Sequence, residues 1–325
     1  MSVSSPPTPV RTPVAEREGG SSPTPLVSVG VPVYNGARFL EQALASIRAQ
    51  TLSDIEIIIS DNASTDATPD ICRRAAAEDC RVRYTRLERN VGAAANFNRC
   101  AALARGAYFK WAAHDDEIAP TLLEKCVDRL ERDPRAVLCY SRTRVVDEQG
   151  RPIEDYAYDL GGDEPDVAQR FANLIRGHRC YEVFGVIRLD ALRQTGMILP
   201  CAHGDGVLLG RLGLLGTLVE VPEPLFFARS HAGQSMRMLG DYQSYAEWFD
   251  PVLRGRLVFP YWRILLEHAR SLRCIPLPWT HRVRCARQLL RWAVDFRNGL
   301  KLDLKLAARA YCGRNPFRRR ATPAR

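Results

Sequence analysis

Two adjacent aspartates, Asp115 and Asp116, follow an apolar segment at residues 108–112. Neighbouring carboxylates repel each other unless a cation lies beside them. Mg²⁺ and Mn²⁺ prefer such oxygen ligands, and both ions also bind diphosphates. The same two residues could instead begin a helix, because acidic side chains stabilise a helix N-terminus. Taken alone, the pair leaves a metal site and a helix cap as alternatives.

A second acidic segment, residues 61–66, follows the apolar run at 55–60. Its first residues, Asp61 and Asn62, offer a carboxylate and an amide that could accept the imide N–H of a pyrimidine base. The hydroxyl and acidic residues that come next fit a helix cap. Capping does not require Asp61, so this carboxylate is a candidate for nucleotide recognition.

A third candidate segment, residues 90–96, combines Asn90, Gly92 and Asn96 with three alanines. Small residues let a backbone approach a ligand closely, and the N-terminus of the helix expected here favours phosphate. The alternative is an ordinary glycine turn that leads into an alanine-rich helix.

A lone carboxylate, Asp205, precedes the apolar helical pattern at residues 207–215. A general base needs a carboxylate in a pocket beside the reacting carbon, and Asp205 could take that role. A helix N-cap explains the same residue locally.

Strand and helix patterns alternate between these candidate residues. Apolar runs predict five strands, at residues 26–34, 55–60, 82–87, 108–112 and 136–140, and a helical pattern follows each of the first four. Such alternation is typical of a mostly parallel α/β sheet with helices on both faces. Ligands bind such sheets at the carboxyl ends of the strands, where the first three candidate segments lie.

The strict alternation ends after residue 150. One helix is expected within 151–180, and short strands are expected at 183–188, 218–221 and 225–228, the last two separated by a Pro-Glu-Pro sequence. From about residue 242 the pattern is helical, with interruptions at Pro276 and Pro278. Residues 1–25 are rich in Pro, Ser, Thr and Gly, and a disordered tail is expected there.

Composition limits the class of protein. With 325 residues, 46% of them hydrophobic, the chain can bury one large core. The ten cysteines include no CxxC pair, so we expect them to be mostly buried and reduced, as in a cytoplasmic protein. Neither a GxGxxG sequence after the first strand nor a GxxxxGK[ST] sequence occurs, which excludes the usual dinucleotide and P-loop sites.

Charge is distributed unevenly along the chain. Residues 251–325 hold 18 Lys/Arg and 3 Asp/Glu, a balance of +15, so the total of +9 leaves −6 for residues 1–250. This distribution does not predict a nucleic-acid-binding core. Basic helices with tryptophan can lie in the headgroup region of an anionic membrane, so 241–325 is a candidate for peripheral attachment to the inner face. Packing of these helices on the protein body is the alternative.

In their order, these segments resemble glycosyltransferase family 2, whose members have the GT-A fold. The family's P-x-Y-N opening corresponds to Pro32, Tyr34 and Asn35, and the resemblance covers residues 26–236. The other matching positions are Asp61-Asn62-Ala63-Ser64-Thr65-Asp66, Asn90, Gly92, Asn96, Asp115, Asp116, Asp205 and the segment Arg229-Ser230-His231. Two departures occur, since Ala113 stands where the family's D-x-D motif has its first Asp, and Gly204 replaces a Glu before the base.

The resemblance implies an inverting glycosyltransferase that acts in cell-surface polysaccharide or glycolipid synthesis. The donor would be a UDP-, dTDP- or GDP-sugar, and the acceptor a saccharide or a lipid-linked saccharide. Asp205 would be the catalytic base, while Asp115 and Asp116, with His231 as a weaker candidate, would bind Mg²⁺ or Mn²⁺. The implied nucleotide-sugar contacts are Pro32, Tyr34, Asn35, Asp61, Asn62, Asn90, Gly92, Asn96 and Asp115.

The resemblance also implies a division of the chain. Residues 26–240 would form the GT-A domain, with a nucleotide-sugar half at 26–150 and an acceptor half at 151–240, and 241–325 would form a helical extension. Two other functions stay open, namely a nucleotidyltransferase of related fold and a catalytically inactive scaffold. The first would normally need a basic Gly-rich loop, which residues 32–39 lack.

Overall fold

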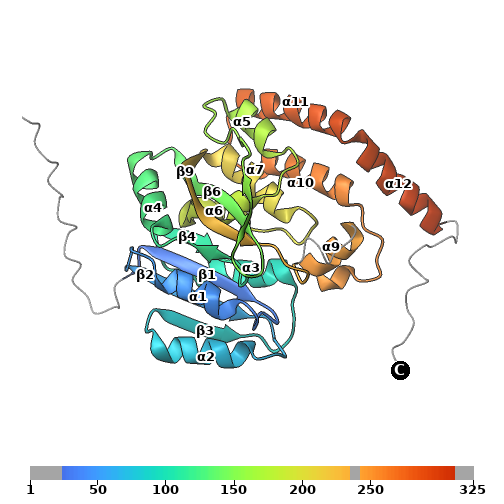
Figure 1. Ribbon diagram of the computed structural model, residues 1–325. Coiled ribbons are helices and arrows are strands. Elements are labelled where there is room, and N and C mark those ends of the chain that lie inside the picture. Colours follow the sequence, from blue (N-terminus) through green and yellow to red (C-terminus); the bar gives the residue numbers. More distant parts are fainter. Residues whose placement is uncertain (1–23, 235–241, 312–325) are drawn as a thin grey trace, which may run out of the picture.

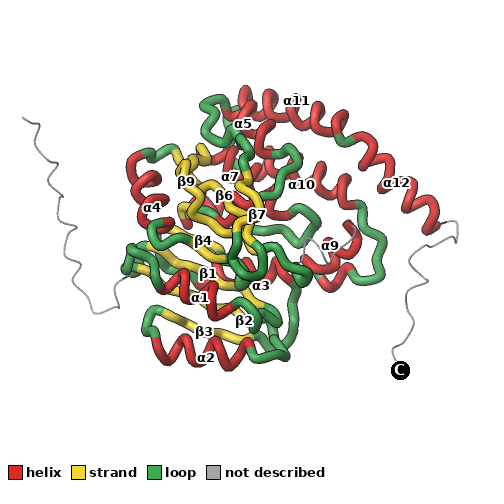
Figure 2. Tube along the Cα trace, viewed as in Figure 1, coloured by secondary structure: helices red, strands yellow, loops and turns green. Residues whose placement is uncertain are grey.

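The computed structural model describes residues 24–234 and 242–311. The predicted tail therefore lies outside the described residues except for its last two positions. A nine-stranded sheet forms the centre, with the strand order β3-β2-β1-β4-β8-β6-β9-β5 and with β7 paired to β6 (Figures 1 and 2). The α/β fold class is confirmed.

The first half of the chain follows the predicted alternation. Strands β3, β2, β1 and β4 pair in parallel, and Val33 at the end of β1 lies opposite Asp61 at the end of β2. The elements are β1 (Val27–Val33), α1 (Leu40–Arg48), β2 (Ile55–Asp61), α2 (Thr68–Glu78), β3 (Val82–Arg86), α3 (Ala93–Leu103), β4 (Tyr108–Trp111), β5 (Glu117–Ile118) and α4 (Leu122–Arg132). Strands β1 and β2 are buried along their whole length, and the alternate valines and isoleucines on one face, from Val27 to Val33 and from Ile55 to Ile59, enter the same core.

The second half of the sheet is mixed. Strand β8 is antiparallel to both β4 and β6, whereas β9 is parallel to β6 and antiparallel to the short β5. The elements are β6 (Ala136–Val146), β7 (Pro152–Tyr156), α5 (Val167–Leu174), the 3₁₀ helix η1 (Tyr181–Phe184), β8 (Val186–Arg188), α6 (Leu189–Gln194), α7 (Gly204–Leu215) and β9 (Thr217–Arg229).

The two strands expected around the Pro-Glu-Pro sequence form a single strand, β9. Its pairing with β6 shifts between Ser141 and Arg142, which lie opposite Val221 and Pro224. Two residues, Pro222 and Glu223, are thereby left out of the ladder. A bulge is where a strand tolerates proline, because proline cannot donate a ladder hydrogen bond. The expected strand at 183–188 is likewise shortened to β8, preceded by η1.

Two apolar cores cover the two faces of the sheet. Helices α1, α2 and α4 contribute Leu44, Cys72 and Leu123 to one core. Helices α3 and α7 contribute Cys100 and Leu208 to the other core. The nine described cysteines are all free and seven of them are buried, as the sequence predicts.

The C-terminal helices pack against the body through a third core. They are α9 (Tyr242–Phe249), the 3₁₀ helix η2 (Pro251–Leu253), α10 (Pro260–Cys274), α11 (Trp279–Asp295) and α12 (Arg297–Tyr311). Leu272, Leu289 and Trp292 meet Phe171 of α5 and Leu214 of α7 in this core. Within the described residues, no helix has the length and apolar character needed to cross a bilayer.

Candidate active site

The loops that follow β1, β2 and β4 meet at one edge of the sheet. Asn62 donates its backbone N–H to the carbonyl of Val33 at 2.8 Å, which joins the first two loops. A Cβ atom added to Gly36 would lie 2.4 Å from Cδ2 of His114, so only glycine fits where the first loop crosses the segment before Asp115. The fold therefore brings three predicted segments together.

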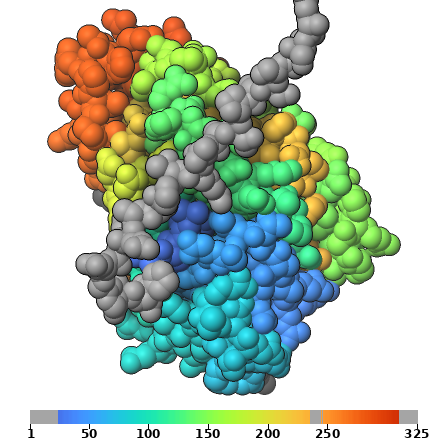
Figure 3. Space-filling view, turned by 90° about the vertical axis from the view of Figure 1, so that its left-hand side faces the viewer, coloured from blue at the N-terminus to red at the C-terminus, as the bar shows by residue number. Residues whose placement is uncertain are grey.

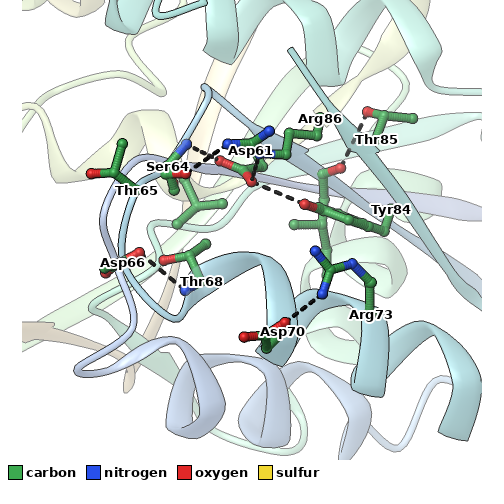
Figure 4. A network of polar contacts seen from close by, with 12 residues as sticks. Asp61, Ser64, Thr65, Asp66, Thr68, Asp70, Arg73, Tyr84, Thr85 and Arg86 are labelled. Carbon is green, nitrogen blue, oxygen red and sulfur yellow. Dashed lines mark hydrogen bonds and ion pairs between the residues drawn. The ribbon is translucent and has the colours of Figure 1, made fainter. Parts of the chain in front are cut away.

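Asp61 is fully buried, and both of its carboxylate oxygens are engaged inside the protein (Figure 4). Its Oδ1 accepts the backbone N–H of Ser64 at 2.8 Å, and its Oδ2 accepts the Tyr84 hydroxyl at 3.0 Å. The Arg86 Nε lies 3.2 Å from Oδ2, and the Arg86 side chain is 45% exposed. Asp61 thus orients an arginine whose outer part reaches the surface, and its direct contact with a base stays a prediction.

Asn35 and Tyr34 form the exposed turn after β1. The backbone of Asn35 is left-handed (φ 50°), a conformation that asparagine tolerates better than most residues. Its N–H donates to Ser64 Oγ at 2.9 Å, and its Oδ1 accepts the N–H of Thr65 at 2.8 Å. Tyr34 is 45% exposed, whereas Pro32 is buried within β1. In this turn, Tyr34 is therefore the residue with a ring available to a ligand.

The asparagines at 62, 90 and 96 form an internal network. Asn62 Nδ2 donates to Asn90 Oδ1 at 3.0 Å, and Asn62 Oδ1 accepts the N–H of Val91 at 2.9 Å. Asn96 is buried, donates to the Ser60 carbonyl at 2.9 Å and accepts the Ser60 hydroxyl at 2.7 Å. These contacts hold the start of α3 against β2.

The space beside Gly92 is filled by the protein itself, which corrects the reason for expecting a glycine there. Its φ is +89°, and an added Cβ would lie 2.5 Å from Pro251 Cδ and 2.7 Å from the Phe249 carbonyl oxygen. The close approach is thus made by the segment joining α9 to η2. The sequence could not show this contact, since the two segments lie far apart along the chain.

Asp115 lies within hydrogen-bond distance of His231. His231 Nε2 lies 3.0 Å from Asp115 Oδ2, and the two side chains are only 9% and 15% exposed. Burial raises the pKa of Asp115, but His114 and His231 together lower it below its ordinary value. Asp115 is therefore ionised and held close to an imidazole.

Asp116 lies in a different electrostatic environment. Its Oδ1 accepts the backbone N–H of Arg229 at 2.8 Å. Burial and the neighbouring Asp115 charge raise the pKa of Asp116 well above its ordinary value, although Arg229 and Lys110 act in the opposite direction. Lys110 is itself fully buried, and burial lowers its pKa to about 8. The pKa values of these two adjacent carboxylates are thus displaced in opposite directions by their different surroundings.

Arg229, which was not predicted as a site residue, holds this loop in place. It is 2% exposed and donates to the carbonyls of Asp115 and Glu148, each at 3.0 Å, and to the Glu117 carboxylate. Its guanidinium also lies 4.8 Å from the centre of the Phe39 ring. The available signal was its place two residues before His231 in a segment that matches the family.

Asp205 lies in the first turn of α7, beside His203 and Cys180. Asp205 Oδ1 is 3.7 Å from His203 Nδ1 and accepts the N–H of Gly206 at 2.8 Å. Cys180 Sγ lies 4.0 Å from the same His203 nitrogen, and burial raises the pKa of this thiol well above its ordinary value. Among the described residues, no donor reaches the other oxygen of Asp205.

The candidate residues form two groups. In the described ranges, Cys180, His203 and Asp205 have ligand atoms that all lie within 4.8 Å of one another, whereas Asp115, Asp116 and His231 form no such group of three. Tyr181 follows Cys180 in the chain, and burial together with the charge of Asp116 raises the pKa of its hydroxyl.

A mixed α/β sheet with these carboxylates defines a glycosyltransferase of the GT-A fold. TarS residues 1–349 of S. aureus in complex with UDP-GlcNAc superpose with a TM-score of 0.61 at 18% identity, covering 86% of this chain and 76% of that one. The mannosyltransferase PcManGT of Pyrobaculum calidifontis, in complex with GDP-Man and Mn²⁺, gives a TM-score of 0.50 at 17% identity, covering 92% and 89%. These likenesses show the fold.

The chain belongs to glycosyltransferase family 2, since the family model for Glycosyl transferase family 2 matches residues 28–195. The Glycosyltransferase GlyG of Streptococcus pneumoniae serotype 4 is 34% identical over 223 residues, which are 65% of this chain and 73% of GlyG. The Chondroitin synthase of Escherichia coli is 32% identical over 131 residues, which are 40% of this chain but only 19% of that protein.

The Uncharacterized glycosyltransferase RP339 of Rickettsia prowazekii is covered over 40% of its length. The chain thus matches less than half of these two relatives.

Proposed function

We propose that this glycosyltransferase moves a sugar from a nucleoside-diphosphate sugar to a hydroxyl of a saccharide or lipid-linked acceptor, with inversion at the anomeric carbon. The observation that carries the proposal is the Asp115–His231 contact beside Asp116, at the edge where the loops after β1, β2 and β4 meet. Family membership supports the reaction class.

Asp115 and His231 would hold Mg²⁺ or Mn²⁺. Their donor set fits, because one carboxylate and one imidazole lie 3.0 Å apart and leave the remaining positions to phosphate oxygens and water. The ion would neutralise charge on the diphosphate leaving group. Asp116 would contribute negative charge from the adjacent position while its oxygen stays bonded to the Arg229 backbone. The metal ion in the PcManGT complex supports a role for a divalent cation in this fold.

Asp205 would act as the general base. Its unbonded oxygen would accept the proton of the acceptor hydroxyl, whose oxygen forms the new bond to the anomeric carbon as the bond to the diphosphate breaks on the opposite face. Burial lowers the pKa of His203, so this neighbour is neutral and does not neutralise the carboxylate. The His203 ring limits the positions that the Asp205 side chain can adopt.

The nucleotide would bind near Tyr34, Asn35 and the surface part of Arg86. UDP-GlcNAc and GDP-Man in the solved neighbours support a nucleotide-sugar donor. We assign donor binding to residues 26–150 and acceptor binding to 151–240, and we place the reaction in polysaccharide or glycolipid synthesis on the cytoplasmic side of the membrane. The curated relatives include a chondroitin synthase, which supports a saccharide acceptor.

Donor hydrolysis tests this proposal. Purified full-length protein is incubated with UDP-, dTDP- and GDP-sugars and Mn²⁺ or Mg²⁺, and the released nucleoside diphosphate is measured. Release from one donor should require metal and fall in Asp115→Ala and Asp116→Ala. Asp128→Ala, on the 56% exposed carboxylate in α4, is the matched control and should behave as wild type. No release and no calorimetric donor binding across the panel would refute the proposal and favour the scaffold.

A further inference from the structure

The outward surface of α11 and α12 has no partner within the described part of the chain. The inward surface is filled, because Cys285, Leu289 and Trp292 are buried and the Trp292 indole donates to the Ile175 carbonyl at 2.8 Å. Leu300 of α12 is also buried. Packing against the protein body therefore explains the apolar residues on the inward side of these helices. It does not explain the residues on the outward side.

Apolar side chains lie on that outward surface. Leu290, Val294, Leu302 and Leu304 are exposed by 68%, 60%, 48% and 53%, and Trp279 at the start of α11 by 72%. Positions 290 and 294 are four residues apart and so point the same way from the helix. Single exposed apolar residues are ordinary, but a run along two consecutive helices indicates an interaction surface.

Basic side chains lie between these apolar residues. Arg287, Arg291, Lys301 and Lys305 are exposed, and among the described residues no carboxylate forms an ion pair with any of them. Arg48 and Arg74 in the N-terminal half, by contrast, form ion pairs with Asp79 and Glu41. Unpaired basic charge beside exposed apolar groups is the composition of an interfacial helix.

We infer that this outer face, defined by Arg287, Leu290, Arg291, Val294, Lys301 and Lys305, binds the surface of an anionic lipid bilayer. Lysine and arginine can place their charge among headgroups while their methylene stems and the neighbouring leucine and valine enter the acyl boundary. A nucleic acid would bind the basic side chains, but it would offer no apolar contact to Leu290 and Val294. The lipid surface accounts for both kinds of side chain.

The placement of the two helices suits such a surface. Figure 1 shows α11 and α12 as a long, gently curved arm along one side of the molecule, with α12 extending beyond the body. Figure 3 shows the orange part of the chain as an outer corner of the surface, at the opposite end from the blue and cyan N-terminal part. A bilayer can therefore meet this face without covering the N-terminal half.

Vesicle co-sedimentation tests the inference. Full-length protein is mixed with phosphatidylcholine vesicles that contain or lack phosphatidylglycerol, with neither donor nor acceptor present. We expect binding to the anionic vesicles alone, weakened by salt. Arg287→Glu/Arg291→Glu should lower partitioning about 25-fold or more, since each basic residue near an anionic surface raises it about five-fold. Because no sugar transfer is measured, the result is independent of the proposed function.

Two further variants distinguish the explanations. Arg73→Glu/Arg132→Glu makes the same charge change on α2 and α4, where the side chains are 63% and 78% exposed, and should bind as wild type. Leu290→Ser/Val294→Ser should weaken binding several-fold with unchanged charge. Absence of binding, or equal loss in both charge variants, overturns the inference. Loss in the Arg287/Arg291 variant with full binding by the serine variant overturns the bilayer contact and indicates a general polyanion site. Circular dichroism checks that each variant is folded.

Discussion

Replacing Asp116 with asparagine should stabilise the protein in the absence of metal. The asparagine keeps an oxygen that can accept the Arg229 N–H, now at 2.8 Å, and it removes the charge that burial and Asp115 disfavour. Two carboxylates in close contact repel each other by a few kcal/mol at the effective dielectric constant of a protein surface. Protonation of Asp116 relieves part of this repulsion energy. We therefore expect a gain of about 1–2 kcal/mol in the free energy of unfolding at pH 8, or about 1.5–3 °C in Tm.

The stability gain in Asp116→Asn should increase as the pH rises. Because the pKa of Asp116 is raised in the folded state, the penalty for its charge is absent below the unfolded pKa and grows as the pH rises toward the folded value. The gain in Asp116→Asn should thus be smaller at pH 4 than at pH 8. Thermal unfolding with chelator present, followed by circular dichroism at several pH values, measures it.

Asp115→Asn supplies the opposite control. The pKa of Asp115 is lowered, so its charge stabilises the fold above its unfolded pKa, and this contribution is lost as the pH falls. That variant should be destabilised at pH 8 and still destabilised near pH 4, and the effect should shrink only as the pH falls below the ordinary aspartate pKa toward the lowered folded value. A pH-independent effect in both variants, or destabilisation of Asp116→Asn at pH 8, would show that the two carboxylates do not differ as described.

Three other substitutions test the remaining parts of the site. Asp205→Asn should keep donor binding by calorimetry but lower transfer by about 10²–10⁴-fold, the usual contribution of a general base. Asp61→Asn should lower the free energy of unfolding in urea by about 1.5–3 kcal/mol, because it loses the charge-assisted contact with Arg86, and unchanged unfolding would count against that contact. Gly92→Ala should cost about 1–3 kcal/mol in the same assay, since φ is +89° and the Cβ would meet Pro251, and an unaffected variant would mean that the two segments are not packed as described.

Local patterns were sufficient to predict the first half of the fold. The runs at 27–33 and 55–61 are rich in valine and isoleucine, and this local pattern predicts a strand without any knowledge of the neighbouring strands. The insertion of β8 between β4 and β6 could not be predicted in this way. Three residues are too few for a periodic signal, and their place in the sheet depends on contacts with strands about 50 and 80 residues earlier in the chain.

In the candidate site, too, local patterns predicted some features, whereas others depend on contacts between distant parts of the chain. Asp61 and Asp115 could be found because a carboxylate at a strand end is visible locally and because the order of motifs matches a family. What each carboxylate contacts was not visible, since Tyr84 and His231 are separated from their partners by 23 and 116 residues. The enclosure of Asp61 follows from such contacts, and a direct contact of its carboxylate with a base stays a prediction.

Arg229 explains why the aspartate pair is suited to an added cation. A buried arginine beside two carboxylates would ordinarily neutralise them, but its guanidinium is directed to Glu117, to the Phe39 ring and to backbone carbonyls. Only its backbone N–H reaches the Asp116 carboxylate. The fixed positive charge thus holds the loop in shape without a side-chain ion pair to either aspartate, which leaves the Asp115 carboxylate to its contact with His231 and to the cation that we propose there.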